Sequence, residues 1–148
     1  MIDDVLIVPL NSSHIQDVAG LEKECFSLPW SEQSIAEVLE NNSSRFYVAV
    51  SNMKVQGYIG SNFILDEGYV TNIAVTELAR SNGVGGKLLE NLISVAVKEK
   101  MAFLTLEVRA SNQKAIRLYE NFGFADCGKR KNFYSKPTED ALIMTKML

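Results

Sequence analysis

The sequence feature that most constrains the fold is a helix-forming stretch that separates two strongly apolar strand segments. Residues 69–75 read as a strand, and an apolar helical period begins at Gly83. The second strand segment, residues 102–108, holds one ionisable side chain among apolar ones. A strand, a helix of this length and another strand form a right-handed β-α-β crossover, so the two strands are predicted to be parallel.

The segment before this crossover has the period of an antiparallel meander. Apolar residues alternate with others from Phe46 to Val50, as a strand requires. Residues 51–54 read as a turn, residues 55–65 as a long strand, and residues 66–68 as a second turn. Three strands joined by such short turns favour antiparallel pairing.

A short strand at residues 5–9 and a first helix are predicted near the N-terminus. Asn11 or Ser12 can cap this helix. Its apolar face is formed by Ile15, Val18, Ala19, Cys25 and Phe26. The one histidine, His14, lies at the start of this helix, where a surface position is expected.

A second helix is predicted to begin after Ser31, a good N-cap residue, and to run to about residue 40. Trp30, just before the cap, and Ile35, at the fourth helical position, can form a hydrophobic staple. This packing explains Trp30 as well as a place in a substrate groove does.

The chain after the crossover predicts one more helix and two strands. The helix is marked by Ala115, Leu118, Tyr119 and Phe122 and ends at Gly123, a favoured C-terminal capping residue. The strands fit residues 125–134 and 141–147. The predicted fold class is therefore a mixed α/β (α+β) sheet, predominantly antiparallel, with a central parallel β-α-β crossover and helices on both faces.

Composition limits the class of protein. A length of 148 residues predicts a single domain over residues 1–148, and 47% hydrophobic with 22% charged residues is ordinary for a globular fold. A net charge of −3 argues against a general nucleic-acid binder. The apolar runs are too short to span a bilayer, and the acidic start of the chain lacks the basic region of a secretory signal. These features predict a cytoplasmic protein that uses neither a membrane nor nucleic acid directly.

Cysteine and histidine usage limits the chemistry. Cys25 and Cys127 belong to no C-x-x-C pair and are predicted to be reduced, packed thiols. A single histidine excludes a multi-histidine metal site, and it excludes a histidine-assisted nucleophile unless His14 serves. We therefore expect no metal, and chemistry that depends on carboxylates, tyrosine, backbone groups or a co-substrate.

A glycine-rich segment at residues 80–87 connects the first crossover strand to the helix. Glycine permits close approach of the backbone to a ligand, and amide N–H groups at a helix N-terminus bind phosphate oxygens. The segment matches neither the Walker A pattern nor the dinucleotide fingerprint, because Leu88 stands where the latter requires glycine. The sequence alone leaves two interpretations, a pyrophosphate cradle and a plain turn.

Glu107 is the ionisable residue of the second crossover strand, near its C-terminal end. Ligands of open α/β sheets bind beyond such strand ends, so Glu107 is a candidate general base. It shares a strand face with Phe103 and Thr105. The alternative is a structural carboxylate paired with Arg109 or Lys114.

Tyr119 shares the apolar face of the following helix with Ala115 and Phe122. This pattern is typical of a core tyrosine. If its hydroxyl reaches a cleft, the phenol can donate a proton to a departing anion.

Taken together, these segments resemble the GNAT superfamily of acetyl-CoA-dependent N-acetyltransferases. The first is Asn-Ile-Ala-Val at residues 72–75, and the second is Arg-Ser-Asn-Gly-Val-Gly at residues 80–85, which has the form Arg/Gln-x-x-Gly-x-Gly/Ala. Leu-Glu-Val-Arg-Ala-Ser-Asn follows at residues 106–112, and Ala-Ile-Arg-Leu-Tyr-Glu-Asn-Phe-Gly-Phe at residues 115–124. Their order and spacing cover about half of the chain.

The resemblance implies a site for acetyl-CoA as co-substrate. The backbone of Ile73, Ala74 and Val75 would hold the pantetheine arm, and Asn112 would add a hydrogen bond to the cofactor. The pyrophosphate would be wrapped by Ser81, Asn82, Gly83, Val84, Gly85 and Gly86.

The resemblance also implies catalytic roles. Glu107 would act as the general base and Tyr119 as the general acid, with direct attack of an amine on the thioester and no covalent enzyme intermediate. The alternatives are a non-catalytic acetyl-CoA-binding module, against which the presence of both residues speaks, and a GNAT enzyme that acetylates a lysine side chain or a small amine.

Further segments resemble one branch of the superfamily, the bacterial ribosomal-protein alanine N-acetyltransferases. They are Pro-Trp-Ser at residues 29–31, the stretch at residues 106–112, and Arg-Lys-Asn-Phe-Tyr at residues 130–134. The branch implies as acceptor the N-terminal alanine of a small-subunit ribosomal protein, and an enzyme that is a monomer or weak homodimer. Gly86 departs from the arginine or lysine common there. The basic residues 129–131 could contact phosphate or substrate, or form a solvated strand end.

Overall fold

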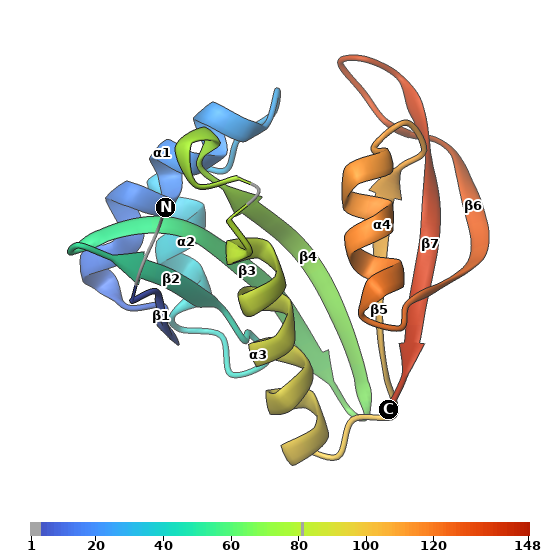
Figure 1. The fold of residues 1–148 in the computed structure, drawn as a ribbon, viewed down its shortest axis with the longest axis horizontal. Coiled ribbons are helices and arrows are strands. Elements are labelled where there is room, and N and C mark those ends of the chain that lie inside the picture. The colour runs from blue at the N-terminus through green and yellow to red at the C-terminus, as the bar shows by residue number, and fades with distance from the viewer. Residues whose placement is uncertain (1–3, 81) are drawn as a thin grey trace.

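In the computed structural model, which describes residues 4–80 and 82–148, the chain forms a seven-stranded sheet with helices on both faces (Figure 1). The strands are β1 (Leu6–Pro9), β2 (Tyr47–Ser51), β3 (Lys54–Ile64), β4 (Glu67–Val75), β5 (Phe103–Arg109), β6 (Ala125–Tyr134) and β7 (Glu139–Met147). The helices are α1 (Ile15–Cys25), α2 (Glu32–Val38), α3 (Val84–Lys98) and α4 (Gln113–Asn121), with short 3-10 turns η1 (Ser12–His14) and η2 (Glu77–Ala79).

The strand order is β1-β2-β3-β4-β5-β7-β6. Neighbouring strands are antiparallel except β4 and β5, which are parallel and are joined through α3. The predicted fold class, with its crossover in a mostly antiparallel sheet, is confirmed.

The first cap lies where the sequence places it, but it begins a 3-10 turn rather than the α-helix itself. Asn11 Oδ1 accepts a hydrogen bond from the Ser13 N–H at 2.8 Å, and the Asn11 N–H donates to His14 Nδ1 at 3.1 Å. The turn continues directly into α1. His14 is half-buried, and it satisfies a backbone donor that would otherwise lack a partner.

Ser31 caps α2 as predicted, with its hydroxyl oxygen accepting the Ser34 N–H at 3.1 Å. The helix ends at Val38 rather than near residue 40, because residues 39–41 continue as tighter turns. Ile35 is fully buried, and Trp30 packs in the same cluster with its ring 6.1 Å from that of Phe46. Trp30 thus packs against this core, and it also lines a second pocket; its staple contact with Ile35 and its place in a substrate groove both stay predictions.

One predicted turn is wrong in its position. The β3–β4 hairpin turns at Leu65 and Asp66, with Leu65 at φ +54°, and Glu67 already pairs with Ile64. Gly68, which the sequence places in the turn, lies in the strand. A Cβ at this residue would come within 2.5 Å of Leu104, so glycine permits β4 and β5 to approach each other here.

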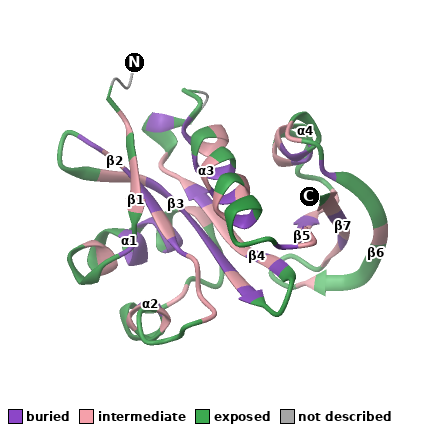
Figure 2. Cartoon of the chain, turned by 90° about the horizontal axis from the view of Figure 1, so that it is seen from below, coloured by how far each residue is buried: buried purple, intermediate pink, exposed green. Residues whose placement is uncertain are grey.

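Two apolar cores lie on opposite faces of the sheet, as Figure 2 shows by the buried residues beneath α3 on one side and α1 and α2 on the other. The core under α3 and α4 includes the fully buried Leu88, Leu92 and Leu104. The core under α1 and α2 includes Val18 and Ile35. Each face of the sheet therefore has its own packed layer.

The site is positioned by a split between β4 and β5. The two strands pair only from Glu67–Tyr69 to Phe103–Thr105 and separate beyond, as Figure 1 shows. Thr71 is an extra residue in β4, because Gly60 pairs with Asn72 while Ser61 pairs with Val70. Such a bulge bends a strand and increases its twist. The bend carries the end of β4 away from β5.

Candidate active site

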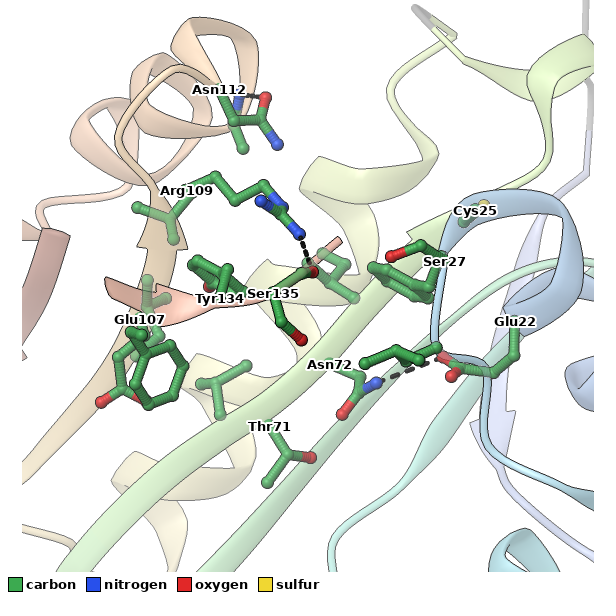
Figure 3. Close-up of a pocket in the computed structure, with 18 of the residues that line it drawn as sticks. Glu22, Cys25, Ser27, Thr71, Asn72, Glu107, Arg109, Asn112, Tyr134 and Ser135 are labelled. Atoms are coloured by element: carbon green, nitrogen blue, oxygen red, sulfur yellow. Dashed lines mark hydrogen bonds between the residues drawn. The ribbon is translucent and has the colours of Figure 1, made fainter. Parts of the chain in front are cut away.

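A cavity of about 580 Å³ occupies the split between β4 and β5 (Figure 3). Its walls come from the end of α1 and the loop after it, from the bulged part of β4, from the end of β5, from α4, and from the β6–β7 loop. The lining residues are Glu22, Cys25–Leu28, Val70–Ile73, Leu106–Arg109, Asn112, Ala115, Tyr119 and Phe133–Pro137.

The edge of β4 that faces the cavity carries backbone groups that no strand pairs. The Val75 carbonyl points to this edge, since it accepts hydrogen bonds from Arg80 Nε at 3.0 Å and from Cys25 Sγ at 3.6 Å. Backbone groups of a strand alternate between its two edges. Ile73 and Val75 therefore present their backbone to the split, whereas Ala74 presents its backbone to β3.

The glycine-rich segment forms the start of α3, just past the end of β4. Gly83 is the N-cap residue, in the left-handed conformation at φ +80°, and no side chain caps the helix. The first amides of α3 thus point beyond the helix end. Asn82 is exposed and Val84 is buried in the core, so Val84 offers only its backbone. Ser81 lies outside the described residues.

Two glycines of this segment also serve helix packing. A Cβ at Gly85 would lie 3.4 Å from Leu118, and one at Gly86 would lie 3.5 Å from Phe122. The start of α3 therefore approaches α4 closely. None of the described residues 80–86 lines the cavity itself.

Arg80 braces this segment against its neighbours. Besides the Val75 carbonyl, its guanidinium donates to Cys25 Sγ at 3.4 Å and lies 3.8 Å from the Glu24 carboxylate. Burial raises the pKa of the Cys25 thiol. Both cysteines are free, as predicted, but Cys127 is exposed and the prediction that it is packed is wrong, because it lies on an exposed stretch of β6.

Glu107 lies on the cavity wall with a side chain that is 5% exposed, and its carboxylate pairs with Arg130 Nε of β6 at 3.4 Å. The alternative partner Arg109 instead pairs with Glu139 at 3.3 Å. The basic residues 129–131 are thus more than a solvated strand end, since one of them contacts the candidate base.

Arg109 ties the β6–β7 loop to the end of β5. Its guanidinium donates to the carbonyls of Pro137 at 2.9 Å and Ser135 at 3.2 Å, and it stacks 4.5 Å from the Tyr134 ring. Hydrogen bonds from Ser111, whose N–H lies 2.6 Å from the carboxylate, hold the pKa of Glu139 below its usual range. This network fixes one wall of the cavity.

We expect Arg109→Ala to free this wall. Amide hydrogen exchange of residues 133–138 should become at least about tenfold faster, because several charge-assisted hydrogen bonds are lost together. Exchange mass spectrometry measures this directly. Arg45→Ala is the matched control, since Arg45 has a comparable ion pair with Glu99 at 2.8 Å on a distant surface. Equal exchange in the loop of both variants would contradict the assignment.

Tyr119 is both a core residue and a cavity residue. It is 4% exposed, and its ring lies 5.9 Å from that of Phe124, yet it lines the cavity. Burial raises its pKa well above the ordinary value, and the nearby Tyr134 adds to the rise. The phenol therefore holds its proton, as a general acid requires.

Glu107 and Tyr119 belong to opposite faces of the sheet. Leu104, Leu106 and Val108 point into the core under α3 and α4, to which Tyr119 also belongs. Glu107 points to the other face, the side of α1 and α2. A group held in the split can thus be reached by a base from one face and by an acid from the other.

Asn112 caps α4, with its Oδ1 accepting the Ala115 N–H at 3.2 Å, while it also lines the cavity. Its Nδ2 donates to no described residue.

One residue at the site, Glu22, was not predicted from the sequence. Its spacing from Val18 and Cys25 places it on the apolar face of α1, and this misplaced charge was the available signal.

The described part of the chain has no cluster of three or more metal-ligating side chains. It also has no helix long and apolar enough to cross a membrane.

Comparison with known proteins identifies the family. Residues 15–124 match the family model described as the acetyltransferase (GNAT) family. The chain belongs to this family. It is accordingly an acyltransferase, and its split sheet is the fold of GNAT enzymes.

Several relatives of this GNAT chain have names that specify an activity. A protein of Escherichia coli (strain K12) is 37% identical over 93% of this chain and 94% of its own length, and one of Salmonella typhimurium (strain LT2) is 34% identical over 91% and 92%. Both are named ribosomal protein bS18-alanine N-acetyltransferase. The crystal structure of the E. coli ribosomal-protein-S18-alanine N-acetyltransferase matches with a TM-score of 0.90 and 34% identity, over 97% of this chain and 94% of that one.

Proposed function

We propose that this chain transfers an acetyl group from acetyl-CoA to a protein N-terminal α-amine, specifically the N-terminal alanine of ribosomal protein bS18. The observation that carries the proposal is the split between β4 and β5, with Glu107 on one face and Tyr119 on the other. Residues 1–148 act in it as one N-acetyltransferase domain. An acceptor of this kind puts the reaction in the cytoplasm.

The residues at the split fit acetyl-CoA. The amide-containing pantetheine arm can pair with the Ile73 backbone and the Val75 N–H at the open edge of β4, as an added strand would; the Val75 carbonyl already accepts from Arg80 and Cys25. The amides of Asn82 to Gly86 at the start of α3 suit the pyrophosphate, and the free Nδ2 of Asn112 can donate to the cofactor. Ser81, which the resemblance also assigns to this cradle, lies outside the described residues. Bound in this way, acetyl-CoA supplies a thioester carbonyl for attack.

Glu107 removes a proton from the attacking amine. An α-amine has a pKa of about 7.7–8.0, against about 10.4 for lysine, so it needs less help to reach the neutral form. A carboxylate on the cavity wall can take this proton directly or through one water. Arg130, at 3.4 Å, orients the carboxylate.

Tyr119 supplies a proton to the departing thiolate from the other face. Its raised pKa keeps the phenol protonated at neutral pH. The two roles are complementary, since one group takes a proton from the amine and the other gives a proton to the thiolate.

The experiment that tests the proposal is thiol release from acetyl-CoA with three acceptors. They are a peptide with the N-terminal sequence of bS18, the same peptide with a blocked N-terminus and an internal lysine, and a polyamine. Turnover on the first alone supports the proposal. Turnover on the lysine peptide or the polyamine alone would contradict the proposed acceptor. Binding of acetyl-CoA without turnover on any acceptor would favour a non-catalytic binding module.

We expect Gly83→Val to weaken acetyl-CoA binding by about tenfold, because valine is strained at φ +80° and distorts the first turn of α3. Isothermal calorimetry measures the affinity. Gly20→Val is a matched control, since a Cβ at either glycine meets no atom within 4 Å. Wild-type affinity in Gly83→Val would discredit the phosphate cradle.

A further inference from the structure

Glu22 of α1 is a fully buried carboxylate at the wall of the cavity. Its Oε1 accepts the backbone N–H of Trp30 at 2.9 Å. Its Oε2 accepts the Tyr58 hydroxyl and the Asn72 Nδ2, the latter at 3.2 Å. The carboxylate thereby joins α1 to the loop before α2, to β3 and to β4. A buried carboxylate with three donors is held in one geometry.

These bonds determine how the Asn72 amide is turned. The Asn72 Nδ2 donates to Glu22 Oε2, so the nitrogen of the amide faces Glu22. The Asn72 Oδ1 is then directed away from Glu22, and it accepts no hydrogen bond from a described residue. Figure 3 shows the Nδ2–Glu22 bond and the oxygen on the other side.

Asn72 lies on the face of the sheet from which Glu107 acts. It adjoins the bulge at Thr71 and lines the same cavity as Glu107. It directly precedes Ile73, whose backbone is proposed to hold the pantetheine arm. The free oxygen is thus an acceptor inside the cavity in which the proposed function places the attacking amine.

We propose that Glu22 is a positioning residue that holds Asn72 Oδ1 ready to accept an N–H of the attacking amine. This inference rests on the proposed function. When Glu107 has taken one proton, the neutral α-amine keeps two N–H groups. One of them donates to Asn72 Oδ1, which directs the nitrogen lone pair towards the thioester carbonyl. An amide turned the other way would present N–H groups, which repel the protonated amine as it binds and occupy the lone pair of the neutral amine.

The Glu22→Gln variant tests this polarity. The introduced glutamine must keep its oxygen towards the Trp30 N–H, because a backbone donor cannot turn. Its Nε2 then faces Asn72, which flips and presents Nδ2 to the cavity. We expect the acceptor KM to rise about 10–100-fold, while the acetyl-CoA KM changes less than about twofold.

The double variant Glu22→Gln with Asn72→Asp exchanges the two groups. The introduced aspartate accepts a hydrogen bond from the glutamine Nε2 and again presents an oxygen to the cavity. We therefore expect the acceptor KM to return to within about threefold of wild type. Val18→Ala is the control for structure alone. Val18 is fully buried one helical turn before Glu22 and has no polar group to offer Asn72, so its truncation should lower the melting temperature and leave the acceptor KM unchanged.

Two results would overturn the proposal: a wild-type acceptor KM in Glu22→Gln, or no recovery in the double variant. If Glu22→Gln does not fold, Asn72→Ala is tested in its place. This variant must raise the acceptor KM while the acetyl-CoA KM stays unchanged. The series uses whichever amine the wild type acetylates, so a wrong acceptor leaves the test intact. If no amine is acetylated, the proposed function fails, and the positioning of Asn72 is then tested by NMR. Solvent exchange of the Asn72 Nδ2 protons should be slow in the wild type and fast in Glu22→Gln. Equal exchange in both would refute the positioning role.

Discussion

Replacing Glu107 with glutamine is expected to lower kcat by about 10²–10⁴ while the acetyl-CoA dissociation constant stays within about twofold. The glutamine side chain keeps the shape of the glutamate and can still accept a hydrogen bond from Arg130, but it cannot take a proton from the amine. The groups proposed to bind acetyl-CoA, the β4 backbone and the start of α3, are untouched. Steady-state thiol release and calorimetry measure the two quantities.

Glu99→Gln is the control for this substitution. Glu99 is also a carboxylate paired with an arginine, Arg45, but it lies at the end of α3 and outside the cavity. It should leave kcat unchanged. A wild-type kcat in Glu107→Gln would remove Glu107 from the role of base, and a parallel loss of acetyl-CoA affinity would assign it to cofactor binding.

The second large effect is expected from Tyr119→Phe, which should lower kcat by about 10²–10³. The phenol hydroxyl forms no hydrogen bond with a described residue, so its removal breaks no observed structural bond. The melting temperature should therefore change little. The loss of rate should shrink when the donor is an aryl thioester, because an aryl thiolate departs without a proton. Thiol release with both donors measures this difference.

Tyr134→Phe distinguishes the two tyrosines of the cavity. Burial and the nearby Glu107 carboxylate raise the pKa of Tyr134 to about 12, so it too is a protonated phenol at neutral pH. If Tyr119 is the acid, Tyr134→Phe loses much less activity than Tyr119→Phe. The reverse order would transfer the role to Tyr134.

Local signals in the sequence predicted most of the fold. Ser31 and Gly123 mark helix ends because their chemistry suits those positions, and Gly123 has φ +92°. The change in apolar period after Val75 predicted the crossover, since a strand and a helix bury side chains at different spacings along the sequence. The misplaced turn before β4 arose because Gly68 has a packing role, set by β5, that no local pattern reveals.

Long-range pairings at the site could not be read from the sequence. The partner of Glu107 is Arg130, 23 residues away, rather than the adjacent Arg109. Glu22 meets Asn72 across 50 residues. Such contacts depend on how the strands are ordered in the sheet. The sequence therefore indicated candidate groups, and the fold determined which of them meet.

The measurement that tests the central claim most directly is the position of the transferred acetyl group. A peptide with the N-terminal sequence of bS18 and an internal lysine is incubated with enzyme and acetyl-CoA, and the product is sequenced by tandem mass spectrometry. The account predicts one added acetyl group on the α-nitrogen of the N-terminal alanine. An acetyl group on the lysine Nζ, with a free N-terminus, would contradict it.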